Sequence, residues 1–213
     1  MTTVRIRFEK VQEASYISLL DMQRVMQRVL KRSGVPVWYT LGFNPHIYMT
    51  FSCPLPLGQE SLCESVDVKT EAQTPDLAAW QQALNRVMPA GIRVYAVYPA
   101  DKKADSIAFA DYAIRYSAPA RAMLERYNAL PQALVEKRSK RAVRTMDLKE
   151  YIPALTLQPD GADVAFSLRL PASGALTLNP ALLTGFLETQ FGLPASDARI
   201  LRTGLFTAAG EPF

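Results

Sequence analysis

The stretch LGFNPHIYMTFSCPLPLGQESLCESVDVKT, Leu41 to Thr70, decides the fold of the first half of the chain. It contains two strand candidates, Ile47 to Cys53 and Leu62 to Thr70, joined by a turn rich in proline and glycine. The residues that restrict or free the backbone around the first strand are Gly42, Asn44, Pro45, Pro54, Pro56 and Gly58. An ordinary hairpin needs fewer such residues, so we expect this segment to position a functional group.

The segments on either side of this strand pair complete a recognisable order. Val4 to Phe8 alternates as a strand, and Ser18 to Arg32 has the apolar spacing of a helix. After the strand pair, Asp76 to Met88 is helical by its apolar spacing, and Ile92 to Tyr98 reads as a strand. The resulting order β-α-β-β-α-β is that of the ferredoxin-like, or split β-α-β, arrangement.

The second half repeats this order with an insertion. Its predicted elements are Tyr112 to Ser117, Ala120 to Leu130, Ala154 to Gln158, Ala165 to Leu170, Pro180 to Phe191 and Arg199 to Phe206. A basic run and Thr145 to Pro153 separate its first helix from its strand pair, and a minimal unit would not contain them. We therefore predict an α+β fold of two tandem ferredoxin-like domains, residues 1–104 and 105–213, the second one elaborated. Thr207 to Phe213 is expected to be a loose tail.

Composition limits the functional classes. With 213 residues, 49% of them hydrophobic and 21% charged, the chain can bury a substantial core. No apolar run approaches the roughly 20 residues of a membrane span, and the N-terminus lacks the apolar run of a signal peptide, so we predict a cytoplasmic protein with no membrane partner. Cys53 and Cys63 form no CxxC pair, and we predict free thiols and no metal site.

Positive charge is concentrated in one place. The net charge of +4 permits a polyanionic partner without requiring one. Five cations fall within eight residues, with no acid between them: Lys137, Arg138, Lys140, Arg141 and Arg144. Such a run is usually a solvated loop, but it is also what a segment that contacts phosphates needs.

The first helix and the following turn offer a second group of candidates. Arg24 and Arg28 recur at helical spacing on the face opposite the apolar stripe, and Asp21, three residues before Arg24, is expected to be ionised and paired. The turn GFNPH comprises Gly42, Phe43, Asn44, Pro45 and His46. His46 is the only histidine in the chain, and histidine is the residue type that most often acts as an acid–base group near neutral pH. If turn and helix are neighbours, they form an anion-binding surface.

Several motifs together carry a family resemblance. They are IRFEK, ISLLD, GFNPH, CPLPLG with Glu64 and Asp67 after it, KRSKRAVRTMDLKEYI and RTGLF. The chain resembles DUF2344, a family of bacterial proteins linked to radical-SAM enzymes. The family pattern reads SHLD where this chain has Ser18-Leu19-Leu20-Asp21, and GFNPHPR where Ile47-Tyr48 follows His46. This chain therefore lacks that histidine and that arginine.

The resemblance implies a role beside a radical-SAM enzyme. Two distant cysteines cannot supply the three-cysteine motif of such an enzyme, so S-adenosylmethionine and the iron–sulfur cluster are expected only in the partner and no cofactor in this chain. We predict a non-catalytic accessory protein that binds tRNA or ribosomal RNA and presents it for modification. One alternative is a small-molecule-binding accessory whose pocket is lined by the GFNPH turn, Asp21 and Glu64. The other is an RNA-processing enzyme with His46, Asp21 or Asp147 as its acid–base group.

Overall fold

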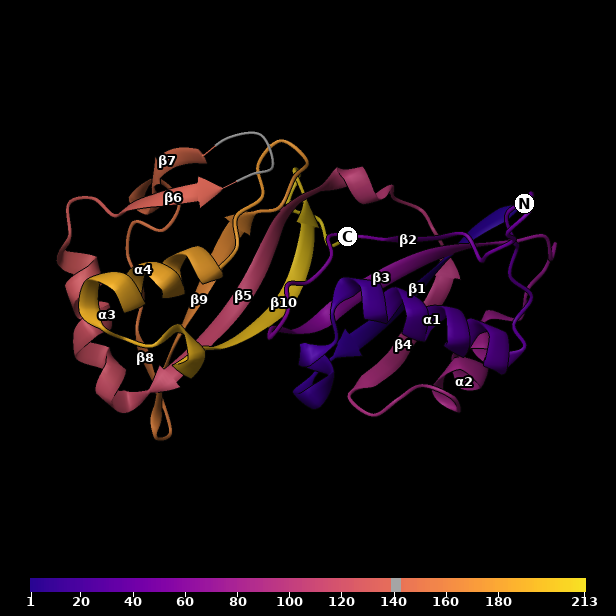
Figure 1. Ribbon diagram of the computed structural model, residues 1–213, viewed down its shortest axis with the longest axis horizontal. Helices are drawn as coiled ribbons and strands as arrows, with labels where there is room; N and C mark the ends of the chain where they lie inside the picture. Colours follow the sequence, from indigo (N-terminus) through magenta and orange to yellow (C-terminus); the bar gives the residue numbers. More distant parts are fainter. Residues whose placement is uncertain (139–142) are drawn as a thin grey trace. The chain divides into compact units, whose positions relative to one another are not determined.

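The computed structural model describes residues 1–138 and 143–213, and of Arg138 only the backbone. The chain divides into two compact units. Unit 1 comprises Met1–Ile107 and Gly204–Phe213, and unit 2 comprises Ala108–Thr203. Each unit combines a β-sheet with two α-helices (Figure 1), so the predicted α+β class is confirmed. None of the described helices is both long and apolar enough to span a membrane.

Unit 1 follows the predicted order of elements. Its sheet runs β4-β1-β3-β2, and every neighbouring pair of these strands is antiparallel. A short 3-10 helix, η1 (Gln12–Tyr16), precedes α1, and η2 (Ala104–Ser106) follows the last strand. The main elements are β1 (Thr2–Lys10), α1 (Leu19–Ser33), β2 (Met49–Phe51), β3 (Glu60–Thr70), α2 (Leu77–Asn85) and β4 (Ile92–Pro99).

The core of unit 1 lies between one face of this sheet and its two helices. Val4, Ile6 and Phe8 of β1 alternate toward that face and are buried. Met26 of α1 and Trp80 of α2 belong to the same buried cluster. Burying such a side chain completely contributes about 1.5–3 kcal/mol. The residues between the apolar ones in β1 therefore point to the opposite face.

The first strand of the predicted pair is shorter than its sequence suggests. β2 covers only residues 49–51 of the predicted 47–53. Ile47 pairs instead with Tyr39 in an isolated bridge, and Cys53 has a φ of 47°, in the left-handed region that strands exclude. The partner strand β3 begins two residues earlier than predicted, at Glu60. The special backbone residues thus shorten one strand and shape the turns around it.

Unit 2 has the same strand order as unit 1. Its sheet runs β10-β5-β9-β8, with β5–β9 and β8–β9 antiparallel. Ile107 at the start of β5 and residues 204–207 of β10 belong to unit 1. The elements are β5 (Ile107–Ser117), η3 (Ala118–Ala120), α3 (Arg121–Ala129), β6 (Leu134–Arg138), β7 (Val143–Asp147), η4 (Leu148–Glu150), β8 (Gln158–Asp160), β9 (Asp163–Pro171), α4 (Ala181–Phe191), η5 (Ala195–Asp197) and β10 (Arg199–Thr207).

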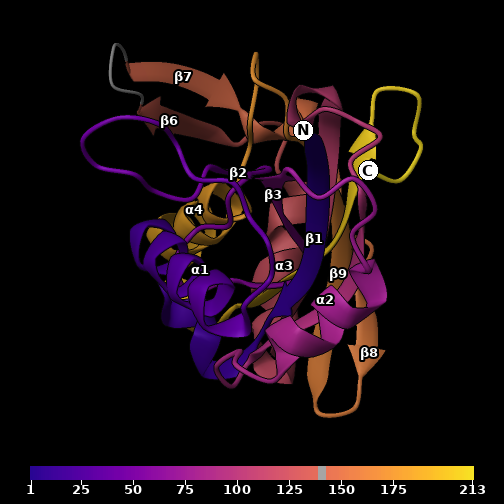
Figure 2. The same ribbon diagram turned by 90° about the vertical axis from the view of Figure 1, so that its right-hand side faces the viewer.

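The inserted segment of unit 2 is a β-hairpin where we expected a loop. β6 and β7 pair antiparallel in a two-stranded sheet of their own, from Leu134 opposite Asp147 to Arg138 opposite Val143. Figures 1 and 2 both show this hairpin at the opposite end of unit 2 from the β8–β9 turn. These strands could not be predicted from the sequence, because their exposed, charged residues do not show the alternation with buried residues that identifies a strand.

The expectation of a loose tail is wrong. Phe213 is buried, and its backbone N–H donates to the carbonyl of Leu205 at 2.9 Å. Phe206 and Pro212 form an isolated bridge, and the ring of Phe213 lies 4.1 Å from the guanidinium carbon of Arg5. A buried aromatic anchor holds a segment whose sequence has no periodicity.

Candidate functional site

The GFNPH turn, residues 42–46, is closed by hydrogen bonds on both sides. The backbone N–H of Thr40 donates to the carbonyl of His46 at 2.8 Å, and the N–H of His46 donates to the Thr40 hydroxyl at 3.1 Å. Gly42 has a φ of 123°, which side chains other than hydrogen disfavour. The turn therefore has a defined geometry, and all five of its residues are exposed.

The imidazole of His46 takes part in this closure. Its Nδ1 lies 3.1 Å from the carbonyl oxygen of Asn44 and 3.0 Å from the hydroxyl oxygen of Thr40. A carbonyl oxygen only accepts, so the contact with Asn44 favours the tautomer with a proton on Nδ1. In that tautomer, Nδ1 is committed to the turn and Nε2 is left as an acceptor.

Ser18 caps helix α1, and Asp21 in the first turn is paired with Arg24, as predicted. The hydroxyl of Ser18 accepts from the backbone N–H of Asp21 at 3.2 Å and donates to its carboxylate at 2.8 Å, and Arg24 bonds the other carboxylate oxygen at 2.9 Å. The hydrogen bond from Ser18 and then that from Arg24 lower the pKa of Asp21. Arg24 and Arg28 are exposed. Among the described residues, no hydrogen bond or ion pair joins these arginines to the GFNPH turn.

The hairpin places two cations directly opposite each other. Lys137 of β6 pairs in register with Arg144 of β7, so both side chains project from the same face. Arg144 is exposed and forms no hydrogen bond or ion pair with another described residue. The ammonium of Lys137 donates to the carbonyl of Thr177 at 2.6 Å. Lys140 and Arg141 lie outside the described residues.

Asp147 closes the base of this hairpin. One of its carboxylate oxygens accepts from the backbone N–H of Ala133 at 2.8 Å and from that of Lys149 at 2.9 Å. It thereby caps the short helix η4. A carboxylate that holds two backbone donors has a structural task that accounts for its presence here.

Glu64 is buried beside a very small cavity in unit 1. Lys10, also buried, lines the same cavity, and its ammonium donates to the carbonyls of Ser15 and Ile17 at 3.3 and 2.7 Å. The remaining lining residues are apolar: Phe8, Leu19, Met22, Phe51, Pro54 and Leu55. The cavity of about 10 Å³ has room for about one water molecule.

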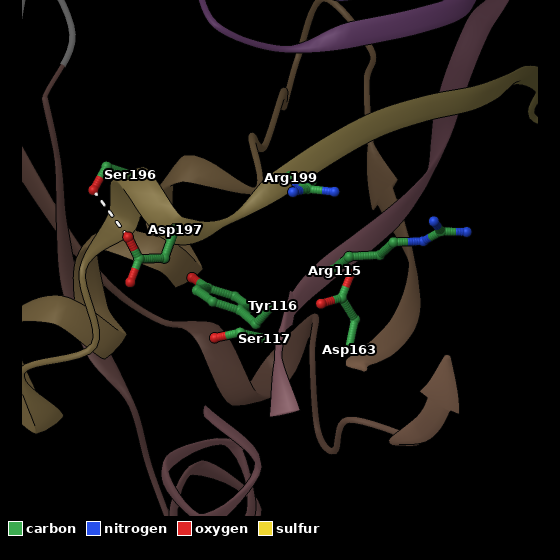
Figure 3. A pocket seen from close by; sticks show the side chains of 7 residues that line it. All are labelled: Arg115, Tyr116, Ser117, Asp163, Ser196, Asp197 and Arg199. Atoms are coloured by element: carbon green, nitrogen blue, oxygen red, sulfur yellow. Dashed lines mark hydrogen bonds between the residues drawn. The ribbon is translucent and has the colours of Figure 1, made fainter. Parts of the chain in front are cut away.

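A larger pocket in unit 2, of about 310 Å³, lies where β5 ends and β9 and β10 begin. Figure 3 shows the hydroxyl of Tyr116 pointing toward Asp197. The guanidinium groups of Arg115 and Arg199 extend away from this hydroxyl. The hydroxyl is buried without a hydrogen-bond partner among the described residues, and burial raises the pKa of Tyr116. Arginines and aspartates offset each other in this lining, so the pocket does not select polyanions.

The sequence analysis missed a cationic cluster on the second face of the unit 1 sheet. Arg5 is buried and bonds both carboxylate oxygens of Asp67 at 2.8 Å and the carbonyl of Lys102 at 2.6 Å. Arg7 donates to the hydroxyl of Tyr95 at 3.1 Å and to the carbonyl of Phe213. The alternation VRIR in β1 was the available signal, because it places both arginines on one face.

The described residues contain no group of three or more His, Cys, Asp or Glu side chains that could hold a metal ion. No curated protein matches the chain. A family model described as "Uncharacterized protein conserved in bacteria (DUF2344)" matches residues 3–180. Since the match covers most of the sequence, including the GFNPH turn, the caps and the hairpin, the chain belongs to the DUF2344 family.

Proposed function

We propose that this protein is a non-catalytic accessory of a radical-SAM enzyme that binds RNA, tRNA or ribosomal RNA, and presents it for modification. We propose further that residues 1–104 and 105–213 form two ferredoxin-like domains. The strand orders β4-β1-β3-β2 and β10-β5-β9-β8 support this, because in both units the first and third strands of a β-α-β-β-α-β chain occupy the centre. The hairpin β6–β7 is then an addition to the second domain, available for a task beyond folding.

The observation that carries RNA binding is the pair of opposed cations on this hairpin. Like charges directly opposite each other on one strand pair destabilise it. Lys137 and Arg144 occupy such positions, and Arg144 has no described acid to offset its charge. A phosphate bound between them would remove the repulsion and gain two charge-assisted hydrogen bonds. RNA offers phosphates at the regular spacing that a basic hairpin and its flanking cations can follow.

The bonding of the candidate acid–base groups supports a non-catalytic role. His46 bonds within its own turn, Asp21 bonds the capping Ser18 and Arg24, and Asp147 holds the base of the hairpin. Each of these groups has a structural partner that accounts for its position. The cavity beside Glu64 is too small for a metabolite, which counts against a small-molecule site at Glu64.

The test is a salt titration of RNA binding. Fluorescence anisotropy with labelled tRNA would compare the parent with the double variant Lys137→Ala/Arg144→Ala. The slope of log K against log salt should fall by about 1.4–1.8, because each lost phosphate contact removes about 0.7–0.9. The control Arg93→Ala/Arg121→Ala removes the same charge from exposed ion pairs elsewhere and should keep the parental slope. Equal slopes for the parent and the hairpin variant would refute the proposal.

A further inference from the structure

A long segment of unit 1 carries no charge although much of it is exposed. From Ser33 to Gln59 the sequence has 27 consecutive residues without Asp, Glu, Lys or Arg, in a chain that is 21% charged. Burial does not explain this composition. Leu41 is 90% exposed, Phe43 is fully exposed, and Tyr48 and Leu57 also reach solvent. We call the exposed tip formed by Leu41 and Phe43 the apolar knob.

The knob is held in place before any partner arrives. The hydrogen bonds between Thr40 and His46 close the turn just below it, and the bridge between Tyr39 and Ile47 continues that closure. Ile47 is buried in the unit 1 core and anchors the turn. A preorganised loop loses little conformational entropy on binding, so more of its contact energy appears as affinity.

Aromatic packing stiffens the base of the knob. The rings of Trp38 and Tyr48 lie 6.3 Å apart between centroids, and the ammonium of Lys69 lies 5.7 and 4.4 Å from those two centroids. Lys69 comes from β3, outside the uncharged segment. Its charge is thus placed against the rings at the base and not at the tip.

The chemistry of the knob selects a protein as its partner. RNA binding depends on cations that neutralise phosphates, and the tip has none. The centres of protein–protein interfaces, by contrast, are depleted in charge and enriched in aromatic residues, and single rings that fill pockets dominate the affinity. A solvent-exposed Phe and Leu on a stapled turn match that second pattern.

We propose that the apolar knob docks this protein to another protein, with Phe43 inserted into an uncharged, apolar pocket of that partner. The inference rests on the accessory role in the proposed function, for which it identifies the docking element. The hairpin proposed to bind RNA and the knob proposed to dock a protein then belong to different units of the chain. Each can be removed without the other.

The test begins with photocrosslinking in the native cell. Replacing Phe43 by p-benzoylphenylalanine should give one protein adduct, whereas the same substitution at Arg93, an exposed site in the same unit, should not. The adduct's protein is identified by mass spectrometry and its crosslinked residue must lie in an apolar pocket. An adduct with RNA, an adduct only with a second copy of this chain, or no adduct at all would overturn the proposal.

Calorimetry with that purified protein completes the test. Phe43→Asp should weaken binding about 30-fold or more, as expected for an interface anchor, and Phe43→Trp should stay within about threefold of the parent. Because Phe43 is fully exposed, neither change should lower the thermal midpoint. Phe43→Asp should also keep the parental salt slope for tRNA, while the hairpin variant should keep the parental affinity for the protein. A parental tRNA salt slope in the hairpin variant would contradict RNA binding alone, and an undiminished affinity of Phe43→Asp for the protein would contradict docking alone.

Discussion

The substitution Asp67→Asn isolates the energetic importance of the buried ion pair in unit 1. Asp67 lies directly opposite Arg5 in the β1–β3 register, and the two side chains are bonded at both carboxylate oxygens. The side chain of Arg5 is 0% exposed and that of Asp67 is 14% exposed. Asparagine keeps the size of aspartate but removes its charge, so the guanidinium would remain buried without a counterion.

The expected cost follows from this burial. Burial by itself lowers the pKa of Arg5, but the hydrogen bond and charge of Asp67 outweigh that effect and raise it, so the carboxylate offsets the cost of burying the charge. Removing one partner of a buried pair costs about 3–5 kcal/mol. Because Asp67 is slightly exposed and the carbonyl of Lys102 still accepts from Arg5, we expect the lower end, about 3 kcal/mol.

The assay is urea unfolding followed by tryptophan fluorescence. Both tryptophans of the chain, Trp38 and Trp80, lie in unit 1 and report on it directly. The midpoint should fall at an unchanged m-value, and the thermal midpoint should drop by about 6–12 °C.

A matched control exists in unit 2. Arg169 and Asp111 form the same bidentate cross-strand pair, at 2.7 and 2.8 Å, but with side chains 51% and 29% exposed. Asp111→Asn, followed by circular dichroism, should therefore cost less than about 1 kcal/mol. Equal costs for the two substitutions would refute the argument from burial.

Three further predictions concern the backbone, a cap and the C-terminal segment. Gly91→Ala would place a Cβ 2.6 Å from the carbonyl oxygen of Val11, whereas the Cβ of Gly58→Ala meets no atom within 4 Å at a similar φ. We expect thermal unfolding to show that Gly91→Ala costs about 1–3 kcal/mol more than Gly58→Ala, and similar costs for both would contradict this reasoning. The pKa of Asp21 is lowered from its usual 3.8, so the stabilising effect of its carboxylate is complete above that value and is lost as the pH falls through the folded-state pKa. The difference in stability between the parent and Asp21→Asn should therefore shrink below about pH 4. A difference that stays constant would contradict a stabilising role of the Asp21 charge at the start of α1. Phe213→Ala should destabilise unit 1 by about 3 kcal/mol in the fluorescence assay, while a value near zero would restore the loose tail.

Local sequence signals predicted the regular parts of the fold. The apolar spacing of Ser18 to Arg32 predicted α1, and the alternation of Val4 to Phe8 predicted β1. Gly34, with a φ of 73°, ends α1 close to the predicted position. These features follow from interactions between residues a few positions apart, which a sequence displays directly.

The parts that sequence analysis missed depend on long-range pairing. Arg5 and Asp67 meet only because two strands adopt one register, and Phe213 is buried only because the chain returns to β1. The structural bonds of His46 were equally hidden, since nothing in GFNPH indicates that Thr40 would share its Nδ1. The sequence thus located the special turn, but it could not assign the task of its histidine.

The two positions at which the chain differs from the pattern that the resemblance implies agree with the docking that we propose. The histidine and arginine of that pattern correspond here to Leu19 and Tyr48, and both side chains are partly exposed apolar groups. An enzyme whose mechanism needed those ionisable groups would not keep its activity with leucine and tyrosine in their place. A protein-binding surface gains apolar contact area from the same changes. Tyr48 also packs on Trp38 beneath the apolar knob, and this contact stiffens the element that we propose as the docking anchor.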